Sequence, residues 1–300
     1  MITLMLAMII STCSTAILPP GFVLRQFQST RANVVTMKIE ERVVYADNAF
    51  NETIWYKSPD KFKVYVEKDG ETLIFIRNGQ KCMAITSNAR LVSQDLCKSP
   101  VKGFYYTMLM PYGNFLGYLK SIGIKTDYDQ TEIKKVKNEY VTPEGVFILD
   151  YDREPIYVIG VSSDIYKSAL SDAKSDKKNL TDKLLANLKN KAPQIWIQTT
   201  TNYPVRIYGN DPTDNKQFEV LFGTYSMDAN EFPFPTSIKL NSEGGSSLSY
   251  GVKNFDSNVG VMDEQIFNLS SYTTKFPKTI GEESLTQNKK TMLNYLKEYR

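Results

Sequence analysis

Few residues of this chain have types and spacing that could do chemistry, and a pair of carboxylates is the first of them. Asp150 and Asp152 flank Tyr151 and offer two groups for general acid and base work. They straddle the end of a strand-like run, where carboxylates are common. The chain contains no histidine, which excludes a Ser-His-Asp or Cys-His nucleophile pair and a histidine-ligated zinc. We therefore expect no catalytic residue, no metal site and no cofactor, and an enzyme is the least favoured interpretation.

The chemistry of the cysteines depends on whether the chain is exported. The N-terminus opens with an apolar run from Ile2 to Ile10, too short to span a bilayer, followed by small residues suited to cleavage. We predict an export signal over residues 1–16, although its start lacks Lys and Arg; a core helix is the alternative. Cys13 would then be lost with the signal or carry a lipid anchor. We favour the loss, because Thr12 fits poorly before a lipidated cysteine.

Cys82 and Cys97 remain beyond this signal. A pair of cysteines in an exported chain indicates a disulfide. Two antiparallel strands joined by a turn at residues 87–89 would bring both to the open end of one hairpin. Two free buried thiols are the alternative, and a single sequence does not choose between them.

Composition indicates an ordinary folded protein. The 300 residues are 42% hydrophobic and 23% charged, and a chain of this length buries a sizeable core. The net charge is only +3, because 36 Lys and Arg are balanced by 33 Asp and Glu scattered along the chain. We expect no nucleic acid among its partners.

The elements that must position any site are mostly strands. Met37 and Ile39 alternate with polar residues, which is the period-two pattern of a half-buried strand, and residues 62–66 repeat that pattern. Asp69-Gly70 and Asn78-Gly79 predict tight hairpin turns. The sequence therefore predicts a meander of antiparallel strands joined by short turns.

Helical segments interrupt and end this meander. The apolar, Met-bearing segment 101–123 predicts one or two short helices that either plug the core or adapt to an apolar partner. The charged insert at 164–192, with a helix over its second half, is interpreted as a solvated face. Ser284 and Gln287 predict a capping box for a C-terminal helix within 282–300.

These patterns predict a mainly β (α+β) fold. We expect one domain over residues 17–281, in which a strongly curved antiparallel sheet forms an unclosed half β-barrel capped by short helices. Such a shell leaves an apolar interior that a helix or a ligand must fill.

The order of several short motifs resembles a known family. The stretch W-Y-K-S-P-D-K-F, residues 55–62, with Asn78-Gly79 beyond it, resembles the outer-membrane lipoprotein carrier (Lol-type) family and its relatives, the outer-membrane lipoprotein-sorting proteins. Ile195-Trp196-Ile197, leading to Tyr203-Pro204-Val205-Arg206, is similar to a strand pair of the sorting proteins. The resemblance covers most of the chain from Phe22 to about Leu269.

This resemblance implies a function. It implies a periplasmic carrier, expected as a monomer, that holds acyl chains of lipoproteins or lipids and moves them from an inner-membrane donor toward an outer-membrane acceptor. The alternative is a cell-envelope sensor or interaction module that uses the same shell and signals through its C-terminal helix. The family's carrier has an Arg directly before the proline, where this chain has Ser58. That departure favours a sorting-like protein with a different cargo.

Candidate lining residues follow from the alternation along the strands, and a one-residue slip in register would turn a whole set outward. Trp55 is interpreted either as part of the wall or as a core anchor. The last two residues of the set would form a movable plug. The predicted acyl-binding lining is Met37, Ile39, Trp55, Phe62, Val64, Val66, Phe75, Met108 and Leu109.

Overall fold

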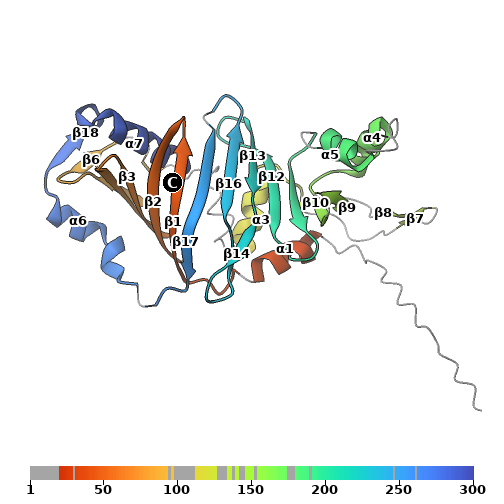
Figure 1. The fold of residues 1–300 in the computed structure, drawn as a ribbon, viewed down its shortest axis with the longest axis horizontal. Helices are drawn as coiled ribbons and strands as arrows, with labels where there is room; N and C mark the ends of the chain where they lie inside the picture. Colours follow the sequence, from red (N-terminus) through yellow and green to blue (C-terminus); the bar gives the residue numbers. More distant parts are fainter. Residues whose placement is uncertain are drawn as a thin grey trace, which may run out of the picture.

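One long curved sheet dominates the computed structural model (Figure 1). The structure describes residues 20–29, 31–93, 96–97, 112–126, 134–136, 139–141, 146–151, 154–173, 180–188, 191–245, 247–260 and 262–300. The strands are β1 (Thr36–Tyr45), β2 (Asn48–Lys57), β3 (Lys61–Lys68), β4 (Glu71–Asn78), β5 (Lys81–Ile85), β6 (Arg90–Val92), β7 (Lys134–Val136), β8 (Glu139–Val141), β9 (Val146–Tyr151), β10 (Glu154–Ile159), β11 (Gln194–Gln198), β12 (Pro204–Asn210), β13 (Gln217–Phe222), β14 (Tyr225–Met227), β15 (Pro233–Pro235), β16 (Ser237–Ser242), β17 (Leu248–Ser257) and β18 (Thr279–Gly281). The helices are α1 (Pro20–Ser29), α3 (Tyr112–Ser121), α4 (Ser163–Ala173), α5 (Leu180–Leu188), α6 (Leu269–Lys275) and α7 (Gln287–Tyr299), with short 3-10 turns η1 (Glu264–Phe267) and η2 (Glu282–Ser284).

The main sheet confirms the predicted fold class. Its fourteen strands lie in the order β18-β6-β5-β4-β3-β2-β1-β17-β16-β13-β12-β11-β10-β9. Neighbouring strands are antiparallel, except that β18 pairs with β6 in parallel. The end strands, β18 and β9, lie at opposite edges of the sheet, and no described pairing joins them. The sheet is therefore curved but unclosed, a half-barrel.

Tight turns keep the first strands short and in register. Asp69 and Gly70 both have positive φ, 52° and 76°, as a type I′ turn requires, so this predicted hairpin is confirmed. The next turn differs from the prediction by one residue. Asn78 pairs with Lys81, which leaves Gly79 and Gln80 as the turn, with positive φ at Gly79.

The concave face of the sheet carries the main core. Along β1 to β4, alternate side chains point to this face and are buried, while their neighbours on the other face are partly exposed. Helices α1 and α3 cover the part of this face near β12 to β17, where the Phe27 and Phe115 rings lie 5.0 Å apart. Helix α7 covers the part near β1 to β4 (Figure 1). The hollow of the half-barrel is thus occupied by the chain's own helices.

The insert after β10 packs on the opposite, convex face. Helices α4 and α5 form a second core with β10 and β11. Ala169, Ala173, Leu184 and Leu188 are buried there. The interpretation of this insert as a merely solvated face was wrong, because α4 was missed and each helix buries one apolar side. The predicted helix over its second half is confirmed as α5.

The N-cap of the C-terminal helix lies two residues after the predicted one. The Oγ1 of Thr286 accepts a hydrogen bond from the Lys289 amide, so Thr286 is the N-cap of α7. Ser284, which we expected in that place, lies instead in the 3-10 turn η2. The helix itself, within 282–300, lies where the sequence predicts it.

A disulfide joins Cys82 of β5 to Cys97, with their Cα atoms 5.4 Å apart. The bond closes a loop with a sequence separation of 15 residues at the β6 end of the sheet. A cross-link over such a loop restricts the unfolded chain and stabilises a protein by about 3 kcal/mol.

We expect the double variant Cys82→Ser/Cys97→Ser to lose about 3 kcal/mol of unfolding free energy in urea titrations. Adding a reductant to the unmodified chain should give the same loss. Equal stability of the oxidised and reduced chains would show that this bond contributes nothing.

Several predictions fall outside the described residues. They concern the export signal over 1–16, Cys13, the plug residues Met108 and Leu109, and Asp152. Within the part of the chain that the structure describes, no helix has the length and apolar character needed to cross a membrane.

Candidate ligand-binding hollow

The predicted lining residues of β1, β3 and β4 lie together on the concave face. Strand pairing aligns Ile39 with Ile54, Ile54 with Val64, and Val64 with Phe75 in one row across four strands. A second row runs from Met37 through Tyr56 to Phe62. All of these side chains are buried within the main core. The two rows form a continuous apolar floor.

Trp55 lies on the other face, contrary to its place in the predicted lining. It pairs with Lys38 and Lys63, whereas its neighbours Ile54 and Tyr56 point to the core. The Lys63 ammonium lies 5.2 Å from the centre of the Trp55 ring and 5.9 Å from that of Tyr272. Trp55 therefore belongs to an outer aromatic and basic surface.

The segment from η1 through α6, which leads toward α7, contacts this outer surface, and we call it the strap. In η1, the Glu264 carboxylate accepts hydrogen bonds from the ammonium groups of Lys57 and Lys61. These two lysines lower the pKa of Glu264 to about 2, so the exposed carboxylate stays charged at ordinary pH. The strap ties the outside of β2 and β3 to the segment before α7.

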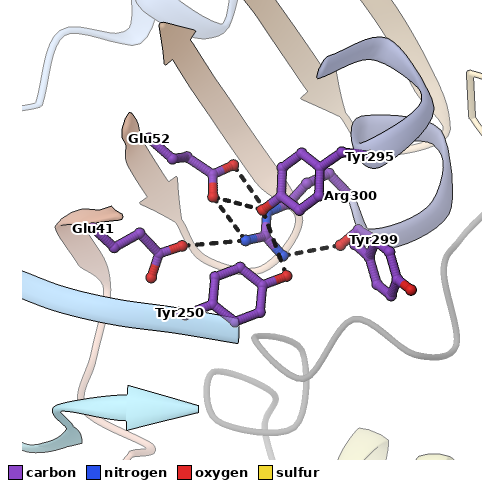
Figure 2. A network of polar contacts seen from close by, with 6 residues as sticks. All are labelled: Glu41, Glu52, Tyr250, Tyr295, Tyr299 and Arg300. Atoms are coloured by element: carbon purple, nitrogen blue, oxygen red, sulfur yellow. Dashed lines mark hydrogen bonds and ion pairs between the residues drawn. The ribbon is translucent and has the colours of Figure 1, made fainter. Parts of the chain in front are cut away.

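A buried ionic network lies one row beyond the apolar floor (Figure 2). Glu41 pairs with Glu52 across β1 and β2, two residues along from Ile39 and Ile54. The side chains of both glutamates are 0% exposed, and that of Arg300 is 4% exposed. Arg300 comes from the end of α7, which crosses the hollow above these strands. Three charges thus meet inside the half-barrel.

Arg300 bridges the two carboxylates. Its Nε donates to Glu52 Oε1 at 3.2 Å, and its Nη2 donates to Glu52 Oε2 at 2.9 Å. The same Nη2 lies 3.4 Å from Glu41 Oε1. This two-point contact with Glu52 is the geometry in which Arg–carboxylate pairs are strongest.

Three tyrosines complete the network. Tyr295 donates its hydroxyl to Glu52 Oε2 at 2.7 Å, and the guanidinium lies 5.1 Å from the ring centre of Tyr250 and 5.3 Å from that of Tyr295. Burial raises the pKa of both phenols, so they remain protonated. The Tyr299 ring makes an edge-to-face contact with Tyr45, and its carbonyl oxygen accepts a hydrogen bond from Arg300 Nη1 at 3.0 Å. The site can therefore hold a cation between carboxylates and ring faces.

Sequence reasoning missed this network, although a signal for it exists. Glu41 continues the inward series of Met37 and Ile39 at a spacing of two, and Glu52 precedes Ile54 in the same way. Arg300 follows Leu296 by four residues, so it lies on the buried side of α7. Charged residues at inward positions of adjacent strands indicate a polar site inside a core.

The other part of the hollow holds a second buried cation. Arg31, after α1, donates from Nη1 to the carbonyl oxygen of Phe27 at 3.0 Å and lies 4.1 Å from the centre of that ring. Burial lowers the pKa of Arg31 to about 10. The hollow is thus lined by apolar side chains along its strands, and it contains buried charged groups at Arg31 and at the network around Arg300.

The carboxylates of the enzyme alternative, Asp150 and Asp152, are not tested, because Asp152 lies outside the described residues. Asp150 lies in β9 opposite Pro155, and nothing of its side chain is described. Among the described residues, no group of three or more Cys, Asp or Glu side chains is arranged to hold a metal ion.

Comparison with solved structures finds matches at low sequence identity and with low TM-scores. An outer membrane lipoprotein-sorting protein domain from Vibrio parahaemolyticus shares 8% identity, with a TM-score of 0.42 over 84% of this chain and 97% of that chain. A LolA superfamily protein from Nitrosomonas europaea shares 10% identity, with a TM-score of 0.44 over 84% of this chain and 98% of that one. A DUF1329 family protein from Desulfovibrio piger shares 9% identity, with a TM-score of 0.44 over 84% of this chain and 97% of its own.

No protein-family model and no curated protein sequence matches the chain. Two of the three structures carry the names of the group that the sequence motifs resemble. The strand pair expected from that resemblance, Ile195–Ile197 with Pro204–Arg206, is also present as β11 and β12.

Proposed function

We propose that this protein is a periplasmic carrier that binds acyl chains of lipoproteins or lipids in its half-barrel hollow and moves them toward the outer membrane. The observation that carries the proposal is the apolar concave face of an unclosed sheet, which helices α1, α3 and α7 cover over much of its described length. A sheet that is curved and open on one side offers a long apolar groove once a covering helix moves.

The energetics allow a ligand to replace a helix. Helix α7 buries five large side chains in the described structure, Met292, Leu293, Tyr295, Leu296 and Tyr299. Burial of such side chains contributes about 1.5–3 kcal/mol each, which amounts to roughly 10 kcal/mol for the helix. An acyl chain of about 16 carbons gains a similar amount, at about 0.8 kcal/mol per buried methylene. Two occupants of similar free energy can exchange, and exchange is what a carrier needs for loading and release.

Uptake of a fluorescent fatty acid by the delipidated chain tests this proposal. We expect saturable binding at one site or a few sites, reversed by an unlabelled fatty acid of the same length. We also expect α7 to exchange its amide hydrogens faster when the probe is bound. Absence of saturable uptake would contradict the carrier function.

A further inference from the structure

The ionic network is built like a binding site for a cation. Glu41, Glu52 and Tyr250 belong to three adjacent strands of the sheet, β1, β2 and β17. Together they present two carboxylates and one ring face, and we call these three residues the wall cage. The cation in the wall cage, the Arg300 guanidinium, comes from α7 and not from the sheet (Figure 2). Carboxylates and aromatic faces together are the groups that hold ammonium and guanidinium ions in proteins.

Among the six residues drawn in Figure 2, two carboxylates face one guanidinium. Arg300 supplies one positive charge, and Glu41 and Glu52 supply two negative charges, all with side chains 4% exposed or less. Removal of the partner from a buried ion pair leaves an uncompensated charge, which is strongly unfavourable. A ligand that replaces α7 therefore has to carry a cation. Without one, the buried carboxylates of Glu41 and Glu52 would face the apolar tail of the ligand.

We propose that the wall cage receives the cationic head group of an amphiphile, which takes the place of Arg300. This inference rests on the proposed function and gives its cargo a chemical class: a lipid or acylated peptide whose head carries an amine that is protonated at neutral pH. Arg300 acts as the internal substitute for that head group when the hollow holds no ligand.

The register of the sheet suits such a ligand. The row of Ile39, Ile54 and Val64 lies two residues along the strands from Glu41 and Glu52. Two residues of a strand span about 7 Å, a few methylene groups of an extended chain. A head group held at the wall cage would thus place the first part of its tail on the apolar floor.

Two alkyl probes of equal length test the inference on the unmodified chain. Dodecylamine and dodecanoate, both below their micelle-forming concentrations, would each displace a neutral fluorescent reporter from the hollow. We expect dodecylamine to bind at least about tenfold more tightly at pH 7, since one charge-assisted contact of this kind is worth about that factor. Equal affinities, or tighter binding of dodecanoate, would overturn the cationic preference while leaving the carrier function intact. Failure of both probes and of the reporter to bind would contradict the carrier function itself.

A variant and a second readout locate the preference at the wall cage. In Glu41→Gln/Glu52→Gln, the advantage of dodecylamine should fall to within about twofold of dodecanoate. The matched control is Glu40→Gln, because Glu40 neighbours Glu41 in β1 but is half-exposed. This variant should keep the preference for dodecylamine.

Hydrogen exchange of α7 in the unmodified chain tests the same inference without the double variant, which is needed if that variant does not fold. Dodecylamine should speed exchange near Arg300 in the unmodified chain, and unchanged exchange with bound amine would overturn the replacement of Arg300.

Discussion

Replacement of Arg300 by leucine is expected to lower the free energy of unfolding by about 3–5 kcal/mol. The leucine retains apolar bulk at the end of α7 but removes the cation that contacts Glu41 and Glu52, whose side chains are 0% exposed. The buried carboxylates would then have to take up protons or draw in water, and either response costs stability. Urea unfolding, followed by tryptophan fluorescence or circular dichroism, measures the change.

Arg25→Leu is the matched control, because Arg25 is an exposed arginine of α1. Its effect should stay within about 0.5 kcal/mol. A triple variant that joins Arg300→Leu to Glu41→Gln and Glu52→Gln should recover much of the loss, since a neutral cage no longer needs a cation. A loss below about 1 kcal/mol in Arg300→Leu would show that the ionic network does not hold α7 in the hollow.

Val64→Asp is expected to have an effect of similar size. Val64 is fully buried in the centre of the apolar floor, with Ile54 and Phe75 on either side. A carboxylate there has no cation in its row, so we expect a loss of about 4 kcal/mol or more, together with the loss of acyl-probe uptake.

Tyr65→Asp tests the same strand on its other face. Tyr65 is half-exposed and directly follows Val64. We expect a loss of about 1 kcal/mol, from a cross-strand side-chain pair, and unchanged uptake of the acyl probe. Similar losses in both variants would mean that the two faces of β3 are not distinguished as inside and outside.

Alternation along the strands was enough to predict most of the apolar floor. Met37, Ile39, Phe62, Val64 and Phe75 were each placed by a spacing of two, and the structure has them on one face. The type I′ turn at Asp69-Gly70 kept the register of β3 and β4, because a tight turn leaves no freedom for a slip.

Trp55 shows where this reasoning failed. We placed it in the lining because the stretch from Trp55 to Phe62 was interpreted as part of the wall. Tyr56 pairs with Phe62, however, so the inward series of β2 runs through Ile54 and Tyr56. The side chain that leads the W-Y-K-S-P-D-K-F motif therefore lies outside, over Lys63. Register across a hairpin decides which face of a strand each side chain occupies.

The ionic network depends on contacts that no local pattern contains. Arg300 meets Glu52 across a sequence separation of 248 residues. Local periodicity shows that Glu41 and Glu52 occupy inward positions, but it does not show which element supplies the cation. That partner became visible only when α7 was placed in the hollow.

Native mass spectrometry with lipid extraction, on the chain purified from a periplasm without strong detergent, tests the central claim most directly. The account predicts an acylated species bound to the protein, with an amine-bearing head group enriched over anionic ones. An empty protein that also fails to take up a fluorescent fatty acid would contradict the carrier function and favour an interaction module that uses the same shell.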